Sequence, residues 1–324
     1  MKENSTYTAS PQNFPPVALF VFNRSEQLQQ TLEGLKANNI PVLYVFADGA
    51  RNKDDQENVN QVRRLVDAIE WTKVVKTYHK KNKGLTESIR DGLNSLFKEH
   101  EQVIVVEDDI YVAPDFYDYM RTTLDSYANN PKVACVTGLR YPFKTTPLEN
   151  YPYDVFFTKR FCSWGWGTWK RFWETVEFDP VKLKESLKPK YHADRAGDDM
   201  PIMIQQLVNG EVHGAWDINC AASLILNEQF VAWPTHNMVD NTGLLVGTHA
   251  NGQAPPWELA WEKRYLKGVL RLPATITEQP RIRSAFLQFF FYHLSPDASI
   301  KKLVVWQIKR PLVRGLFHKR KIKN

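Results

Sequence analysis

The sequence predicts an α/β fold in which a mostly parallel sheet is flanked by helices. Five short apolar runs recur in the first 140 residues, and a segment with helical periodicity follows each of the first four. The first run, residues 17–22, lacks polar alternation, which is typical of a parallel strand covered on both faces. Strands that alternate with helices imply right-handed crossovers and therefore parallel strands. The expected strands are 17–22, 42–46, 74–78, 103–106 and 133–137, and the expected helices are 25–38, 55–70, 85–98 and 115–128.

The sequence changes character after about residue 141, where it becomes rich in aromatic residues and less regular. Helical patterns remain at 168–176, 200–208 and 218–227. We expect this second half to pack on the sheet and to form the second substrate site rather than an independent domain. The expected division of the chain is 15–140, 141–280 and a basic amphipathic extension, 281–324.

The net charge of +6 comes from the end of the chain. Residues 298–324 hold nine Lys and Arg and no acid, so the rest has 33 basic against 36 acidic residues. This distribution argues against a nucleic-acid groove and favours contact of the tail with an anionic surface. Because apolar residues are interleaved with the charges, the tail suits the headgroup region of a membrane. The alternative is a last helix that packs on the body and has a solvated basic end.

The cysteines and the first residues indicate a reducing compartment. Cys135, Cys162 and Cys220 are odd in number and far apart, which supports neither a disulfide framework nor a zinc site. Residues 1–16 are polar and rich in proline, without the apolar run of a signal peptide or membrane anchor. We therefore expect a cytoplasmic protein, with peripheral membrane contact only if the tail provides it.

Three consecutive acidic residues, Glu107, Asp108 and Asp109, directly follow one of the expected buried strands. Apolar sequence flanks them on both sides, and their mutual repulsion requires a counter-charge. A hard divalent cation, Mg²⁺ or Mn²⁺, held by one or two carboxylates and diphosphate oxygens, supplies it. Strand alternation places Glu107 and Asp109 on one side and Asp108 on the other. The alternative is that one acid caps the turn and the others pair with Lys or Arg.

Ligands of parallel sheets bind outside the carboxyl ends of the strands. The polar residues that follow the other expected strands are Asn23 and Arg24, then Asp48 and Gly49, and finally the segment 79–84. These positions are therefore candidates for the same site as the acidic triplet.

Six segments together resemble glycosyltransferases of the GT-A fold, and more narrowly the group around animal N-acetylglucosaminyltransferase I and its bacterial relatives. In order and spacing they span most of residues 17–250. They are VALFVFNR at 17–24, YVFADG at 44–49, NKGLTESIRDGL at 82–93, VIVVEDDIYVAPDF at 103–116, SWGWGTW at 163–169 and NTGLLVGTH at 241–249.

The resemblance implies a role for each residue at the strand ends. The acidic triplet matches the DxD-type motif of the family, so Asp109, with Glu107 beside it, is expected to ligate Mn²⁺ or Mg²⁺. Asp108 is expected to face the ribose or the donor sugar. The expected contacts of the nucleotide are Asn23, Arg24, Asp48 and, as a weaker carry-over, Lys83.

The resemblance also implies a catalytic base and a lid. Asp217 stands where the family has a Trp-Asp aspartate before a helix, and it is expected to take the proton of the acceptor hydroxyl. The alternative is that Asp217 is only the N-cap of that helix, in which case Asp198 or Asp199 is the next candidate base. The glycine-rich loop 241–252 is expected to close over the diphosphate, and its His249 either binds phosphate or is structural.

Four tryptophans in the aromatic half have two interpretations. Core packing is the default for side chains of this size, and at most one or two are expected to contact a sugar. The residues are Trp164, Trp166, Trp169 and Trp173.

Together these features predict a metal-dependent inverting glycosyltransferase. The resemblance implies a nucleotide-sugar donor, with a UDP-sugar as the expected one, and a saccharide or lipid-linked saccharide acceptor in bacterial cell-surface polysaccharide or lipopolysaccharide synthesis. The first two parts of the chain would then be a donor-binding half and an acceptor half of one GT-A domain. The alternatives are a nucleotidyltransferase acting on sugar phosphates and a non-catalytic saccharide-binding protein.

Overall fold

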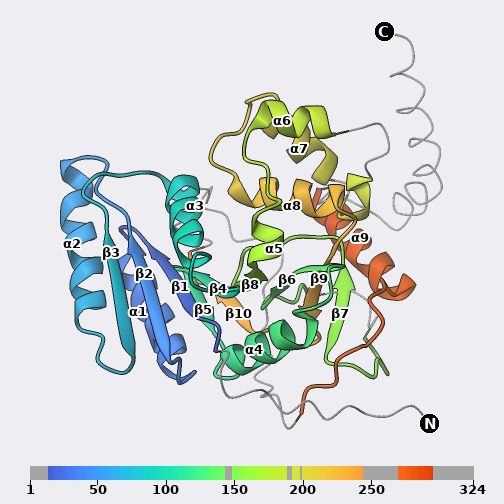
Figure 1. The fold of residues 1–324 in the computed structure, drawn as a ribbon, viewed down its shortest axis with the longest axis horizontal. Helices are drawn as coiled ribbons and strands as arrows, with labels where there is room; N and C mark the ends of the chain where they lie inside the picture. Colours follow the sequence, from blue (N-terminus) through green and yellow to red (C-terminus); the bar gives the residue numbers. More distant parts are fainter. Residues whose placement is uncertain (1–13, 143–147, 188–191, 198, 244–268, 295–324) are drawn as a thin grey trace.

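A computed structural model describes residues 14–142, 148–187, 192–197, 199–243 and 269–294. Its centre is a sheet of eight strands in the order β3-β2-β1-β4-β8-β6-β9-β7 (Figure 1). The strands of the first half are β1 (Val17–Val21), β2 (Val42–Ala47), β3 (Lys73–Tyr78) and β4 (Gln102–Glu107), and they pair with one another in parallel. This agrees with the α/β fold and the parallel strands that the sequence predicts.

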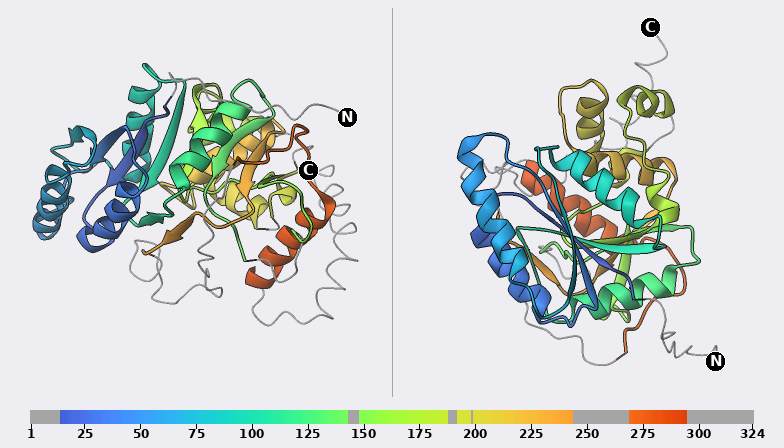
Figure 2. Two further views of the ribbon diagram at one scale, coloured as in Figure 1. Left: turned by 90° about the horizontal axis from the view of Figure 1, so that it is seen from below. Right: turned by 60° about the vertical axis from the view of Figure 1, so that its left-hand side comes forward.

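Helices cover both faces of this parallel half. Helices α1 (Ser25–Lys36) and α2 (Lys53–Asp67) lie on one face, and α3 (Leu85–Leu96) lies on the other (Figure 2). The change of face follows from the strand order, because the chain moves outward from β1 to β3 and then crosses back to β4 on the other side of β1. The switch point of the sheet is therefore between β1 and β4, where ligands of such sheets bind.

The second half of the sheet is mixed. It contains β6 (Val133–Thr137), β7 (Val155–Thr158), β8 (Trp166–Trp169) and β9 (Phe230–Pro234), of which β8 pairs antiparallel with β4 and β6. A separate two-stranded sheet joins β5 (Ile110–Val112) to β10 (Val239–Asn241). Helix α4 (Phe116–Tyr127) precedes β6 and packs against it and against β8.

The expected helix at 168–176 is wrong in its first part. Residues 166–169 form strand β8, and the helix α5 is limited to Lys170–Trp173. Pairing of these residues with β4 and β6 outweighs the local helical pattern. Gly167 lets β8 lie close to Leu124 of α4, because a Cβ atom at this position would lie 3.0 Å from the Leu124 side chain.

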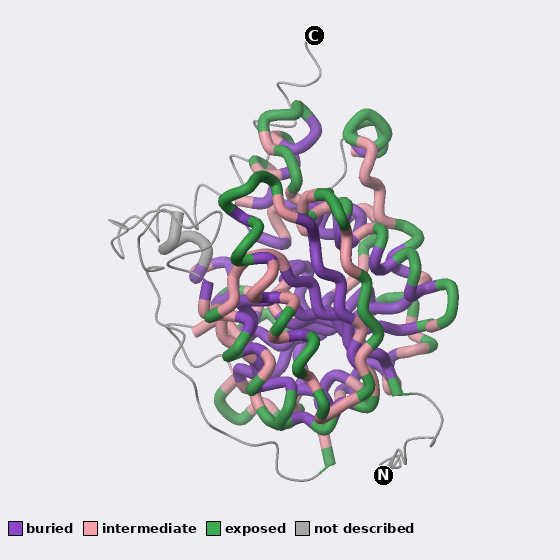
Figure 3. Tube along the Cα trace, turned by 90° about the vertical axis from the view of Figure 1, so that its left-hand side faces the viewer, coloured by how far each residue is buried: buried purple, intermediate pink, exposed green. Residues whose placement is uncertain are grey.

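The remaining helices lie around the second half of the sheet. They are α6 (Pro180–Ser186), the 3₁₀ turn η1 (Ala193–Arg195), α7 (Met200–Val208), α8 (Trp216–Leu226) and α9 (Pro280–Leu294). The sequence predicted α7 and α8 to within two residues. The interior between these helices and the sheet is continuously buried, and the exposed residues lie on the outer turns (Figure 3).

The part of the C-terminal extension that the structure describes is docked on the body. Phe286 and Phe289 of α9 are buried and contact Tyr141, and Phe286 also contacts Trp233 of β9. The basic segment 298–324 lies outside the described residues. Among the helices that are described, none has the length and apolar character needed to cross a bilayer.

Candidate active site

The acidic triplet lies in the turn between β4 and β5, beside the switch point. Glu107 ends β4 opposite Phe20 of β1, and Asp109 immediately precedes β5. Asp108 and Asp109 are 2 % and 9 % exposed, so both carboxylates are almost removed from water. The predicted position of the triplet at a strand end is therefore correct.

Arg24, just after β1, is the counter-charge of this turn. Its Nη2 lies 2.7 Å from Asp108 Oδ1, and its Nη1 lies 2.6 Å from Asp109 Oδ2. Burial lowers the pKa of Arg24, but the two neighbouring aspartates more than offset it, so that the pKa is raised and the guanidinium stays charged. The structure thus contains the arginine pairing that was one alternative for the triplet.

One guanidinium does not neutralise three acids. Burial raises the pKa of Glu107 well above its usual value, and the carboxylates of Asp109 and Asp108 raise it further. Burial also raises the pKa of Asp108 to about 6, against the opposing effect of Arg24. Among the described residues Glu107 has no ion-pair partner. Burial therefore disfavours the ionised forms of Glu107 and Asp108 at this site, and a bound cation would stabilise them.

Backbone contacts hold the two aspartates in place. The Phe22 amide donates to Asp108 Oδ2 at 3.0 Å, and the Thr31 hydroxyl donates to the Asp108 carbonyl at 3.0 Å. The amide and hydroxyl of Thr242 both donate to the Asp109 carbonyl, at 2.8 and 3.1 Å. Residues after β1 and β10 and on α1 thus fix the turn through the carbonyls of both aspartates and one oxygen of the Asp108 carboxylate.

Gly243 is a site residue that sequence reasoning assigned only to a flexible loop. A Cβ atom at this position would lie 2.8 Å from Asp109 Cβ and 3.0 Å from its Cγ. Only a glycine lets the backbone pass this close to the carboxylate. The rest of the predicted lid, including His249, lies outside the described residues.

Asp217 lies in the first turn of α8, close enough to the triplet that its charge contributes to the raised pKa of Glu107. The N-cap of α8 is Ala215, so Asp217 is a helical residue and not the N-cap of the alternative interpretation. Of the reserve candidates, Asp199 pairs with Arg160 at 2.7 Å, and Asp198 lies outside the described residues.

The other predicted donor-binding residues are engaged with neighbouring loops. Asp48 accepts bonds from the amides of Gly49, Lys83 and Gly84 at 2.8 to 3.0 Å, and from the Asn82 side chain. It therefore holds the segment after β3 against the end of β2.

Two further donor-site candidates have partners of their own. Asn23 donates to Asp55 at 2.7 Å, and Lys83 pairs with Asp91. The structure brings Asn23, Arg24, Asp48 and the triplet to one edge of the sheet, while their contacts with a nucleotide stay predictions.

The tryptophans are mainly core residues. Trp166 is fully buried, Trp169 and Trp173 are each 4 % exposed, and Trp164 is partly buried. The Trp166 ring packs 5.5 Å from that of Trp216, the neighbour of Asp217. Core packing, the default interpretation, therefore holds for the three buried side chains.

Two solved structures align with parts of this chain. The mannosyltransferase PcManGT from Pyrobaculum calidifontis, in complex with GDP-Man and Mn²⁺, is 13 % identical, with 69 % of this chain and 77 % of that chain covered and a TM-score of 0.37. Residues 1–349 of TarS from S. aureus are 11 % identical, with 71 % and 61 % covered and a TM-score of 0.42. No curated protein matches the chain.

The sequence profile of the GNT-I family matches residues 2–185, which are more than half of the chain. The match includes β1 to β4, the acidic triplet and strand β8. This confirms the family that the six motifs resemble: the chain belongs to the GNT-I family and is a glycosyltransferase.

Proposed function

We propose that the protein transfers a sugar from a nucleotide-sugar donor to a saccharide acceptor, with inversion at the anomeric carbon and with help from a divalent cation. The observation that carries this proposal is the buried cluster at the β1/β4 switch point, where Arg24 and the acidic triplet meet within reach of the charge of Asp217. Arg24, which would bind the leaving diphosphate, and Asp217, whose carboxylate would act as the base toward the acceptor, are thus brought to the same site.

The residues present fit a divalent cation. Within the described part of the chain, no three acids, cysteines or histidines are already grouped as metal ligands. However, Mg²⁺ and Mn²⁺ sites that also bind phosphate need only one or two protein carboxylates. Asp109 and Glu107 offer hard oxygen donors, and a cation would stabilise the ionised form of Glu107 that burial disfavours. Bound there, the cation would act as a Lewis acid toward the leaving diphosphate.

The chain itself supplies the other parts of the reaction. Asp217 accepts the proton of the acceptor hydroxyl, whose oxygen then attacks the anomeric carbon. Arg24, released from part of its pairing with the aspartates, donates hydrogen bonds to the departing nucleoside diphosphate. Because the proposal contains one displacement, the configuration at the anomeric carbon inverts.

The finer identities come from the family resemblance alone. A UDP-sugar is the expected donor, and a cell-surface polysaccharide or a lipid-linked saccharide is the expected acceptor. Membrane contact through residues 298–324 remains a prediction, since these residues lie outside the part that the structure describes.

Screening nucleotide-sugars for hydrolysis with Mn²⁺, Mg²⁺ or chelator tests the proposal without knowledge of the acceptor. We expect release of nucleoside diphosphate that depends on the cation and is abolished in Asp109→Asn. The matched control is Asp118→Asn, because Asp118 is 79 % exposed on α4 and belongs to no site. Cation-independent hydrolysis, or an Asp109→Asn variant as active as Asp118→Asn, would contradict the proposal.

The products separate the rival functions. A nucleotidyltransferase would release pyrophosphate instead of nucleoside diphosphate, because it attacks phosphorus rather than carbon. A non-catalytic saccharide-binding protein would bind glycans without metal or nucleotide and would hydrolyse no donor.

A further inference from the structure

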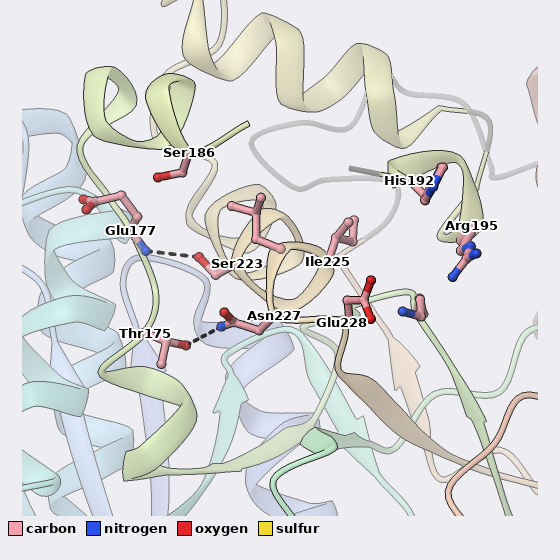
Figure 4. Close-up of a pocket in the computed structure, with 11 residues that line it drawn as sticks. Thr175, Glu177, Ser186, His192, Arg195, Ser223, Ile225, Asn227 and Glu228 are labelled. Atoms are coloured by element: carbon pink, nitrogen blue, oxygen red, sulfur yellow. Dashed lines mark hydrogen bonds between the residues drawn. The ribbon is translucent and has the colours of Figure 1, made fainter. Parts of the chain in front are cut away.

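A cavity of about 570 Å³ lies at the end of α8 opposite to Asp217. The middle of the cavity is lined by the end of this helix, with Ser223, Ile225 and Asn227. One side is lined by Glu177 and Ser186, and the other by His192 and Arg195 (Figure 4). At 1.5 Å per residue, Ser223 is about 9 Å along the axis from Asp217. The cavity is thus separate from the acidic triplet but connected to the candidate base by one helix.

The lining is rich in groups that bind sugar hydroxyls. It combines the hydroxyls of Thr175, Ser186 and Ser223 with the amide of Asn227 and two carboxylates, Glu177 and Glu228. Hydroxyl and amide groups offer both donors and acceptors. Such a surface matches a polyhydroxylated ligand better than an apolar one.

Lys159 is the unusual member of this lining. It directly follows β7 and is only 7 % exposed, with its amine 5.1 Å from the centre of the Phe230 ring. It forms no ion pair with any residue that the structure describes. A buried ammonium group without a carboxylate partner is costly, and the single cation–π contact offsets only part of that cost.

Arg195 places a second positive charge near the Lys159 amine. Burial, and then the guanidinium of Arg195, lower the pKa of the Lys159 amine, while Glu228 and Glu278 oppose them less strongly. Glu278 is the ion-pair partner of Arg283, at 3.5 Å, and Glu228 is exposed to solvent, which weakens its effect. Glu177 accepts a bond from the Asp179 amide on the other side of the cavity. Lys159 and Arg195 thus form no ion pair with a described carboxylate, although Glu228 and Glu278 lie close enough to act on the pKa of Lys159.

The backbone at the end of α8, beside this part of the cavity, is strained. Glu228 has a φ of 53°, in the left-handed region where glycine is the usual residue after a helix. The turn is closed by the Gln229 amide, which donates to the Leu224 carbonyl at 3.0 Å. A charged side chain is thus held at the rim where a glycine would be less strained.

We propose that this cavity is a second saccharide site, which binds a sugar residue that carries a carboxylate or phosphate through Lys159 and Arg195. The anion completes the pairing of the two cations, and the hydroxyl, amide and carboxylate groups bind the ring hydroxyls. The acceptor would then carry an acidic sugar residue close to the hydroxyl that reacts. This assignment rests on the transferase function proposed above.

Calorimetric titration of the full chain without donor tests the site, with glucuronate and glucose 6-phosphate as probes and glucose as the neutral match. We expect the charged probes to bind and glucose to bind more weakly. Lys159→Met and Arg195→Met should each weaken binding of the charged probes about 10- to 100-fold, because a charge-assisted hydrogen bond is lost. The control is Lys182→Met, which removes an exposed cation of α6 that does not line the cavity.

The outcomes are decisive in both directions. The proposal is overturned if none of the probes binds or if glucose binds as tightly as glucuronate. It is also overturned if both cavity variants keep wild-type affinity, or if inorganic phosphate binds as tightly as glucose 6-phosphate. Folding is checked by thermal unfolding, and we expect Lys159→Met to be at least as stable as the wild type, since it removes a desolvated charge. Donor hydrolysis is measured separately, so retained hydrolysis without sugar binding refutes this site alone, whereas binding without hydrolysis refutes the transferase function.

Discussion

Replacement of Arg24 by methionine is the most direct probe of the acidic triplet. Methionine keeps the apolar stem and removes the two contacts of 2.7 and 2.6 Å to Asp108 and Asp109. Breaking a buried ion pair by removing one partner costs about 3–5 kcal/mol, because the remaining charge is left uncompensated. Asp108 meets this condition, since it is 2 % exposed. We therefore expect a loss of roughly this size in the free energy of unfolding.

A divalent cation should reverse part of this loss. Arg24 and the cation interact with the same carboxylates, so the variant is expected to bind Mn²⁺ alone more tightly than the wild type does. At 100 times its dissociation constant, a ligand stabilises the native state by about 2.7 kcal/mol. Mn²⁺ should therefore raise the unfolding free energy of Arg24→Met more than that of the wild type.

Denaturant unfolding with Mn²⁺ or with chelator measures both effects. The control is Arg64→Met, because Arg64 and its ion-pair partner Glu57 are both 64 % exposed on α2. Loss of such a surface pair has little effect on stability. The reasoning is refuted if the two variants are equally stable, or if Mn²⁺ stabilises Arg24→Met no more than it stabilises the wild type.

Three further changes test the positions around the triplet. Asp217→Asn should lower the turnover number about 10²- to 10⁴-fold, measured as nucleoside diphosphate release, because the amide cannot accept the proton of the acceptor hydroxyl. Gly243→Ala should displace the Asp109 carboxylate, since the new Cβ would lie 3.0 Å from Asp109 Cγ, and we expect weaker Mn²⁺ binding in calorimetry. Asp48→Ala should leave the amides of Lys83 and Gly84 without their acceptor, and hydrogen exchange should show faster opening of this loop.

Matched variants separate these effects from ordinary losses of stability. Asp179→Ala removes a true N-cap, whose carboxylate accepts from the Val181 amide at 2.9 Å, and should cost about 1 kcal/mol without affecting turnover. Gly210→Ala strains a residue with a φ of 71° but meets only His213, at 3.9 Å, so it should leave Mn²⁺ binding unchanged. Asp217→Asn with normal turnover, or Gly243→Ala with normal Mn²⁺ binding, would contradict the roles assigned here.

The parallel half of the fold could be predicted from the sequence because its signals are local. The apolar runs of β1 and β4 are buried on both faces, so they show no polar alternation, and each is followed by its polar site residues. The position of Arg24 and the triplet at one edge then follows from the rule for carboxyl ends of parallel strands. What the local signals do not contain is the partner of each charge, which depends on how β1 lies beside β4.

The second half was harder to predict because its elements are defined by distant partners. Residues 168 and 169 were expected to begin a helix, yet they belong to strand β8 between β4 and β6. Gly243 and Lys159 are ordinary in the sequence. Their importance comes from a carboxylate and a guanidinium that are remote along the chain, at Asp109 and Arg195.

Strand β8 also explains how a helix from the second half brings its aspartate to the triplet. Trp166 pairs opposite Val105 in β4, two residues before Glu107, and its ring lies 5.5 Å from Trp216 of α8. Phe161 packs against both indole rings, with centroids at 5.0 and 5.9 Å. Because Asp217 follows Trp216, this aromatic cluster fixes the distance between the candidate base and the acidic turn. Trp166 and Trp216 thus serve the site through packing.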